Sequence, residues 1–150
     1  MGNIEAAQAE LFRSQADLWK KHYDDEFSHR YRKKFYFPKL FEGVEIKGMN
    51  ILEAMCGTGC LTDVLLDMGG RGTGLDISDE LLAHYRRAYP GARTVAGSIF
   101  SLPFEREIFD LVYVVGGLHH AQPHLDKAFS EVHRVLKPGG RFFFLEPPDN

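Results

Sequence analysis

Short apolar runs alternate with amphipathic segments from about residue 48 to the end of the chain. Five runs have the length and composition of strands: 50–55, 72–77, 92–97, 109–118 and 141–147. Three segments between them repeat apolar residues every three or four positions, which predicts helices: 60–69, 78–90 and 124–140. Strands that alternate with helices predict an α/β fold with a mainly parallel, doubly wound sheet and helices on both of its faces.

The sequence indicates where the predicted helices end and which of their side chains are buried. In the second helix, Ser78 is a candidate N-cap, and Pro90 lies past the end. The third helix is ended by a Pro-Gly-Gly sequence at 138–140. The side chains expected to point inward are Leu61, Val64, Leu65 and Met68 in the first helix and Leu125, Ala128, Phe129, Val132, Val135 and Leu136 in the third.

The first part of the chain has a different pattern. Its apolar residues recur every three or four positions, as on one face of a helix: Phe12, Ala16, Trp19, Tyr23, Phe27, Tyr31 and Phe35. The acidic stretch 23–26 is expected to interrupt this helix, and Pro38 is expected to end the region. We therefore divide the chain into an N-terminal helical segment, 1–47, and an α/β core, 48–150.

Composition narrows the class of protein. The chain has 150 residues, of which 44% are hydrophobic and 26% charged, as in one soluble globular domain. A net charge of −3 gives no reason to expect binding to nucleic acid. No run reaches the roughly 18 apolar residues of a membrane span, and the polar start of the chain does not resemble a signal peptide. These features favour a cytoplasmic location.

The segment Ile51–Cys60, with the sequence ILEAMCGTGC, has the pattern of a ligand-binding loop. It joins the first predicted strand to the first helix, so its backbone N–H groups and the helix dipole face a ligand at the carboxyl end of the sheet. Gly57 and Gly59 allow the backbone to come close to that ligand. Two cysteines, Cys56 and Cys60, supply only half the ligands of a structural zinc site, so we predict no metal here.

The type of ligand follows from two carboxylates and one threonine. A dinucleotide-binding loop would have Gly or Ala where this chain has Thr62, whose β-branch disfavours close packing of the helix on the strand. Glu53 would repel a pyrophosphate but would attract an ammonium group, while the loop amides would bind a carboxylate. Asp76, at the end of the second strand, can accept hydrogen bonds from both hydroxyls of a ribose. An amino acid joined to a ribose without phosphate describes S-adenosylmethionine.

Four segments in this order resemble the motifs of the class I S-adenosylmethionine-dependent methyltransferases. They are ILEAMCGTG at 51–59, the acid of GLDIS at 74–78, GSIFSLPFEREIFDLVYVVGGLHH at 97–120 and RVLKPGGRFFFLEP at 134–147. The likeness covers roughly residues 48–147 and is closest to the branch that includes the ubiquinone and menaquinone C-methyltransferases. It implies the strand order 3-2-1-4-5, S-adenosylmethionine as cofactor and a small-molecule methyl acceptor.

The resemblance also implies a set of cofactor contacts, carried over by position. They are Glu53, Cys56, Gly57, Thr58 and Gly59 at the methionine end, Asp76 at the ribose, Ile77, Ser98 and Ile99 around the adenine, and Gly116 beneath the methyl group. Two positions depart from the family pattern. Met55 stands where glycine is usual, which predicts a loop slightly farther from the ligand. Ser98 stands where aspartate is usual, with an expected cost of about 1 kcal/mol in cofactor affinity.

Three residues are candidates for contact with the reacting groups. His119 and His120 follow the fourth strand, where the fold faces the methyl donor, and either is a candidate general base for an acceptor that must lose a proton. His124 is the third histidine of this cluster, but Pro123 makes a shared helical face unfavourable, so we predict no metal there. Tyr23 is either part of a helix face or a lid residue that reaches the sulfonium.

The run 141–147 would be a long apolar edge strand, which soluble proteins normally avoid. The sequence is therefore expected to be part of a longer polypeptide or to pair with another copy through this strand. Methyl transfer to a small molecule is the leading function. Two alternatives stay open here: a catalytically idle protein of the same fold that binds a partner, suggested by Met55 and Ser98, and an NAD-dependent oxidoreductase.

Overall fold

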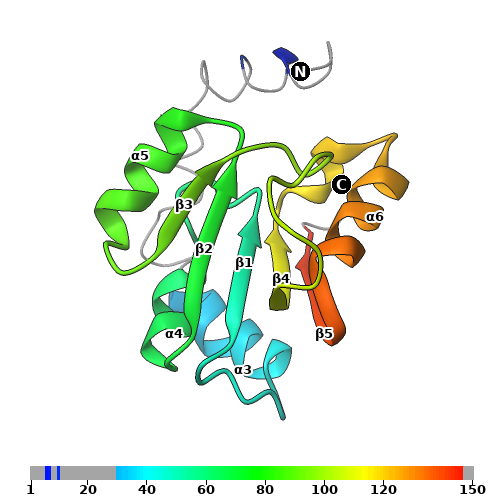
Figure 1. Ribbon diagram of the computed structural model, residues 1–150. Helices are drawn as coiled ribbons and strands as arrows, with labels where there is room; N and C mark the ends of the chain where they lie inside the picture. Colours follow the sequence, from blue (N-terminus) through cyan, green and yellow to red (C-terminus); the bar gives the residue numbers. More distant parts are fainter. Residues whose placement is uncertain (1–5, 8–9, 11–29, 147–150) are drawn as a thin grey trace.

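The computed structural model describes residues 6, 7, 10 and 30–146 of the chain. Its centre is a five-stranded sheet in the order β3-β2-β1-β4-β5, with every neighbouring pair of strands parallel (Figure 1). The strands are β1 (Asn50–Ala54), β2 (Arg71–Asp76), β3 (Arg93–Ala96), β4 (Phe109–Val115) and β5 (Leu136–Leu145). The predicted fold class and strand order are thus confirmed.

Helices connect the strands and cover the sheet. The longer ones are α4 (Thr62–Asp67), α5 (Asp79–Ala88) and α6 (Leu125–Val135), and a 3₁₀ turn, Leu118–Ala121, follows β4. All three predicted helices are present, but α6 ends at Val135, earlier than predicted. Leu136 and the Pro-Gly-Gly sequence at 138–140 belong to β5, so Leu136 is not part of the helical stripe and Pro-Gly-Gly does not end the helix. Ser78 caps α5 as predicted, because its hydroxyl accepts a hydrogen bond from the backbone N–H of Leu81.

Both faces of the sheet are covered, and each has its own cluster of buried apolar side chains. Alternate residues of a strand point to opposite faces, so neighbouring residues belong to different clusters. On one face, Leu52 of β1 and Val112 of β4 pack with Ala128 and Val132 of α6. On the other face, Ile51 and Leu111 belong to a second cluster, in which the α4 side supplies Leu61 and Leu65 and the N-terminal part supplies Phe37, Phe41 and Ile46. This alternation decides which strand residues face the candidate site below.

Two residues expected to point inward are exposed instead. Met68 is 42% exposed because α4 ends at Asp67, so the helical period no longer directs this side chain toward the sheet. Phe129 is 41% exposed; it lies on the side of α6 near the edge strand β5, where its ring packs edge-on against the ring of Phe142. These two predictions are wrong for the same reason: periodicity gives the face of a helix but not what lies opposite it.

The described part of the N-terminal segment contains a π-helical turn (Arg32–Tyr36) and the short helix α3 (Phe37–Leu40). Pro38 lies in the first turn of α3, where its missing N–H is tolerated, and so does not end the region as predicted. Tyr31 and Phe35 of the predicted apolar stripe are 46% and 48% exposed, and its other members lie outside the described residues. The boundary at residues 47 and 48 stays a prediction.

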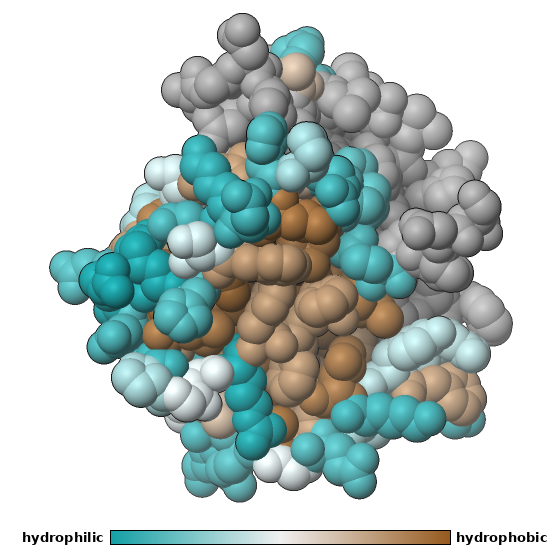
Figure 2. All heavy atoms as spheres, turned by 90° about the vertical axis from the view of Figure 1, so that its right-hand side faces the viewer, coloured by the Kyte–Doolittle hydropathy of each residue, from teal (hydrophilic) through white to brown (hydrophobic). Residues whose placement is uncertain are grey.

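Strand β5 lies at the edge of the sheet, and in the described part of the chain no strand pairs with its outer side. Figure 2 looks onto this side of the molecule and shows apolar side chains gathered in its centre. Among the described residues, Phe144 is the most exposed of the large apolar ones, at 54%. The predicted apolar edge strand is therefore present, and its pairing with another copy stays a prediction.

Candidate functional site

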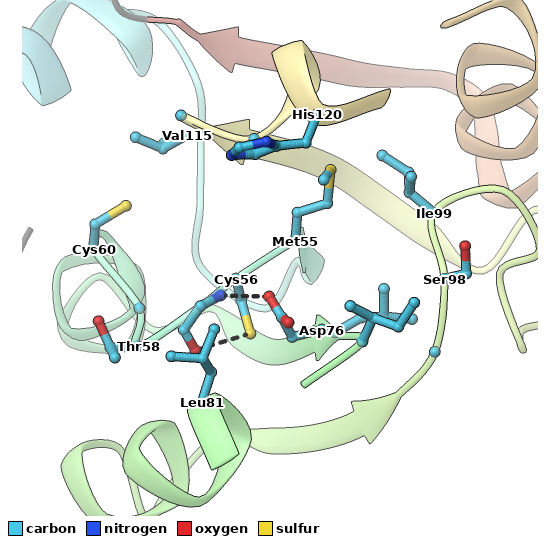
Figure 3. A pocket seen from close by; sticks show the side chains of 17 residues that line it. Met55, Cys56, Thr58, Cys60, Asp76, Leu81, Ser98, Ile99, Val115 and His120 are labelled. Atoms are coloured by element: carbon cyan, nitrogen blue, oxygen red, sulfur yellow. Dashed lines mark hydrogen bonds between the residues drawn. The ribbon is translucent and has the colours of Figure 1, made fainter. Parts of the chain in front are cut away.

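The candidate site is a cleft at the carboxyl ends of β1, β2 and β4 (Figure 3). It encloses about 880 Å³, open solvent included. Most of the residues predicted from the sequence line it: Cys56, Gly57, Thr58, Gly59, Asp76, Ile77, Ser98, Ile99, Gly116 and His120. Glu53 and His119 do not line it, and Tyr23 lies outside the described residues.

The glycine loop folds tightly between β1 and α4. Gly57 and Gly59 both have positive φ, at +53° and +88°. A Cβ on Gly59 would collide with the ring of Tyr89 and would lie 3.0 Å from ring carbons of Tyr85, so only glycine fits there. The Tyr89 hydroxyl donates to the carbonyl oxygen of Gly59 at 3.3 Å. Tyr85 in α5 and Tyr89, which directly follows α5, thus pack against the glycine loop and hold it in place.

Asp76 joins the end of β2 to this loop. Its Oδ2 accepts the backbone N–H of Gly57 at 2.8 Å, and its Oδ1 accepts the N–H of Ser78 at 2.9 Å. The side chain is 7% exposed and lines the cleft, so its burial raises its pKa above the ordinary value, while the hydrogen bonds oppose that rise. The backbone N–H of Ile77 also favours the charged carboxylate, which keeps acceptor capacity for a ligand.

Glu53 lies behind the glycine loop rather than in the cleft. It shares its side of β1 with Ile51, so its side chain points toward α4 and α5 and is 3% exposed. Its carboxylate accepts the N–H of Cys60 at 3.2 Å and the hydroxyl of Tyr85 at 3.2 Å, and Thr62 Oγ1 lies 2.6 Å from it. This placement differs from the expected direct contact with a ligand ammonium group.

Thr62 belongs to the hydrogen-bond network around the Glu53 carboxylate. Besides its contact with Glu53, its Oγ1 lies 2.8 Å from the hydroxyl oxygen of Tyr85. Tyr113 of β4 also donates to the Glu53 carboxylate. The buried carboxylate is thus surrounded by hydroxyl and amide donors that fix the start of α4 against β1. Tyr85 and Tyr113 were not among the sequence candidates, although the small residues Gly59 and Gly74 are a signal that a large ring packs on them.

Burial raises the pKa of Glu53 above its ordinary value, although its hydrogen-bond donors oppose the rise. The folded protein then holds this proton more tightly than the unfolded chain does, so the contribution of Glu53 to stability falls as pH rises from about 4.5. We expect the free energy of unfolding of the wild type, minus that of Glu53→Gln, to be largest near pH 4 and to shrink toward pH 8.

Urea unfolding at a series of pH values measures this difference, and Asp76, whose pKa is also raised, is present in both proteins and so cancels. A difference that grows with pH would contradict the account. It would mean that the surrounding hydroxyl and amide donors stabilise the anion more than burial disfavours it.

The far wall of the cleft carries Ser98 and Ile99. The Ser98 hydroxyl accepts the backbone N–H of Phe100 at 3.2 Å, which holds this turn in place. Ile99 is 4% exposed and packs in the same cluster as Leu75 at the end of β2. Together with Ile77 and Leu81, these residues give the cleft an apolar slot with one hydroxyl at its edge.

Met55 has φ of +55°, in the left-handed region that favours glycine. This is one of the two positions where the sequence departs from the pattern of the family that it resembles. The side chain compensates by filling space beside β4: a Cβ on Gly117 would lie 3.0 Å from Met55 Cβ and 3.2 Å from its Sδ. Met55 therefore forms part of the wall of the cleft next to the histidine turn.

The turn after β4 brings His120, but not His119, to the cleft. His120 is half-buried, and burial, with a smaller contribution from His119, lowers its pKa, so the neutral imidazole is favoured at pH 7. His119 is exposed, and its Nδ1 lies 2.8 Å from Oε2 of Glu146. The two imidazole rings are 3.8 Å apart between centroids. Glu146 is a further residue that the sequence candidates did not include.

The Cys56 thiol is not poised for reaction in this arrangement. Burial raises the pKa of the Cys56 thiol well above its ordinary value, so it stays protonated at neutral pH. Among the described residues, no group of three or more His, Cys, Asp or Glu side chains is placed to hold a metal ion. Within the same residues, no helix is long and apolar enough to cross a membrane.

Comparison with known proteins identifies the family. Residues 52–144 match a methyltransferase domain family. A phthiotriol/phenolphthiotriol dimycocerosates methyltransferase of Mycobacterium ulcerans is 36% identical over 69% of this chain and 39% of its own length. A demethylmenaquinone methyltransferase of Chlorobaculum tepidum is 36% identical over 65% of this chain and 40% of its own length. The chain thus spans less than half the length of these relatives.

Among solved structures, an S-adenosylmethionine-dependent methyltransferase from Mesorhizobium loti superposes with a TM-score of 0.64 and 31% identity. The match covers 71% of this chain and 51% of that protein. The domain match, the order of the strands and the site at their carboxyl ends agree with one another. The chain belongs to the class I S-adenosylmethionine-dependent methyltransferases, a family of enzymes whose cofactor is S-adenosylmethionine.

Proposed function

We propose that this chain transfers the methyl group of S-adenosylmethionine to a small-molecule acceptor that binds beside His120. One observation carries the proposal: a single cleft brings together the glycine loop, the Asp76 carboxylate and the imidazole of His120. The loop and the carboxylate lie at one side of the cleft, and His120 lies across from them at the end of β4 (Figure 3). The cofactor and the acceptor would therefore meet between these two sides.

The residues of the cleft fit S-adenosylmethionine. The Asp76 carboxylate accepts the backbone N–H groups of Gly57 and Ser78, and its remaining acceptor capacity suits the ribose hydroxyls. Ile77, Leu81 and Ile99 offer apolar surfaces for the two faces of an adenine ring, with the Ser98 hydroxyl at its edge. Nothing lies within 4 Å of a Cβ built on Gly57, so the loop leaves open space where the methionine part would lie.

The bound cofactor supplies a methyl group on a sulfonium, which is already activated for transfer. The protein then contributes mainly position and exclusion of water. Met55 and Val115 line the cleft near the histidine turn and give this part of the wall an apolar surface. An acceptor held against this wall would be partly removed from water and kept in line with the methyl group.

His120 is the residue that we place against the acceptor. Its lowered pKa keeps the imidazole neutral at pH 7, so it can accept a proton from a hydroxyl or from a carbon acid. An acceptor that has no proton to lose would not need this function. The role of His120 therefore favours hydroxyl or acidic carbon acceptors over amines that are already neutral.

Reduced quinones are the acceptor class that we propose to test first. A hydroxylated aromatic ring has both a proton to lose and a nucleophilic ring carbon. The relative from Chlorobaculum tepidum is named as a demethylmenaquinone methyltransferase, and it shares 36% identity with this chain. The proposal concerns the class of acceptor and leaves open whether oxygen or carbon receives the methyl group.

The test uses radiolabelled S-adenosylmethionine with a demethylmenaquinol-type naphthoquinol probe. We expect methylation by the wild type, and a fall in kcat of about 10²- to 10⁴-fold in His120→Ala. Affinity for S-adenosylhomocysteine, measured by calorimetry, should stay within about threefold, because the cofactor contacts are on other residues.

His133→Ala is the matched control, since His133 is exposed on α6 and away from the cleft. This variant should keep wild-type turnover. Unchanged kcat in His120→Ala would contradict the role proposed for His120, and a wild-type chain that binds the cofactor but leaves the quinol unmodified would contradict the acceptor class.

A further inference from the structure

Glu146, at the end of β5, contacts every residue of the turn that precedes His120. Its Oε1 accepts the backbone N–H of Gly117 at 3.0 Å and that of Leu118 at 2.8 Å. Its Oε2 lies 3.4 Å from the N–H of His119 and 2.8 Å from Nδ1 of the same residue. One carboxylate thus occupies the amino end of the 3₁₀ turn Leu118–Ala121.

These bonds join two strand ends that the sheet already aligns. The backbone N–H of Gly116 donates to the carbonyl oxygen of Leu145 at 2.7 Å, and Val115 pairs with Leu145. Glu146 extends this pairing past the end of the sheet by means of its side chain. The turn has no side-chain cap of its own, so Glu146 supplies the acceptor that its first N–H groups need.

The hydrogen bond between Glu146 and His119 also affects the position of His120. When His119 is neutral, a hydrogen bond to the carboxylate requires the proton on Nδ1, which selects one tautomer. The His119 ring is then fixed in position, and its centroid lies 3.8 Å from that of His120, at an interplanar angle of 45°. His120 is held from two sides, by the backbone of the turn and by the ring of His119.

We infer that Glu146 is a positioning residue for methyl transfer, which holds the Gly117–His120 turn so that His120 faces the cofactor cleft. The inference rests on the proposed function of His120. It adds that Glu146 touches neither cofactor nor acceptor, since it does not line the cleft. Its effect should therefore fall on turnover rather than on affinity for the cofactor.

Two substitutions separate the two kinds of contact that this carboxylate makes, with the backbone N–H groups of the turn and with the imidazole of His119. Glu146→Ala removes both, so the amides of Gly117 and Leu118 should exchange with solvent at least about tenfold faster. Glu146→Gln keeps a carbonyl oxygen for these amides but replaces the charged partner of His119. At pH 8, long-range ¹H–¹⁵N spectra should show the Nδ1–H tautomer of His119 in the wild type and a shift toward Nε2–H in both variants.

Turnover on an acceptor that the wild type methylates should fall by about 10- to 100-fold in Glu146→Ala, with a smaller loss in Glu146→Gln. The dissociation constant for S-adenosylhomocysteine should stay within about threefold. Glu105→Gln, an exposed glutamate away from the cleft, is the control for loss of one negative charge.

Amide exchange and His119 tautomer that match the wild type in Glu146→Ala would overturn the inference. So would an equal loss of cofactor affinity and turnover, because that pattern indicates general disruption of the site. The spectra do not need an acceptor, so they decide the role of Glu146 even if the wild type proves to bind no cofactor, which would overturn the proposed function instead.

Discussion

Asp76→Ala should abolish measurable cofactor binding while leaving the protein folded. The carboxylate is the acceptor that we assign to both ribose hydroxyls, and hydrogen bonds to a charged group contribute about 1.5 to 3 kcal/mol each. Loss of two such bonds should weaken binding of S-adenosylhomocysteine by at least about 100-fold. The N–H groups of Gly57 and Ser78 also lose their acceptor, so the loop itself becomes less well ordered. Calorimetric titration measures the loss.

Asp79→Ala is the matched control for this variant. Asp79 also carries one negative charge and lies only three residues away, but it is exposed in the first turn of α5 and does not line the cleft. It should bind S-adenosylhomocysteine with wild-type affinity. Equal affinity in Asp76→Ala and the wild type would show that the ribose does not bind at the end of β2.

Gly59→Ala should cost more stability than any other glycine substitution in the loop. The new Cβ would need φ of +88° and would collide with the ring of Tyr89. Left-handed strain and overpacking together predict a loss of about 2 to 5 kcal/mol in the free energy of unfolding. Movement of Tyr89 and Tyr85 to relieve the collision should also displace the loop and reduce cofactor affinity. Urea unfolding and calorimetry measure the two effects.

Two other glycines separate strain from collision. Gly57 and Gly43 also have positive φ, but nothing lies within 4 Å of a Cβ at either position. Gly57→Ala and Gly43→Ala should therefore lose only about 1 kcal/mol, the cost of a left-handed alanine. If Gly59→Ala lost no more than these two variants, the two tyrosines would not pack on the loop as described.

The arrangement of strands and helices could be predicted from the sequence because it depends on local patterns. The periodicity of apolar residues and the signals at helix ends predicted the order of the elements. The N-cap of α5 at Ser78 is one example. The exposure of Met68 and Phe129 could not be predicted in this way. It depends on where a helix stops and on how much of the sheet lies opposite, and both of these are properties of the whole fold.

In the candidate site, too, local sequence patterns predict some features, whereas others depend on the whole fold. Gly57 and Asp76, which lie at or just beyond the carboxyl end of a strand, could be predicted to line the cleft because their place in the α/β fold fixes where they lie. Glu53 was found too, but its direction was not, because the register of β1 turns it toward α5 and the hydroxyl of Tyr85. Glu146 was missed because its contacts with the histidine turn join residues 27 to 29 positions apart.

The measurement that tests the account most directly is calorimetric titration of the purified wild-type chain with S-adenosylhomocysteine, with NAD titrated in parallel. We expect binding in the micromolar range for S-adenosylhomocysteine and no binding of NAD, because the loop and Asp76 suit an amino acid joined to a ribose. A chain that is folded by circular dichroism but binds NAD, or binds neither compound, would contradict the assignment of the cleft as the cofactor site.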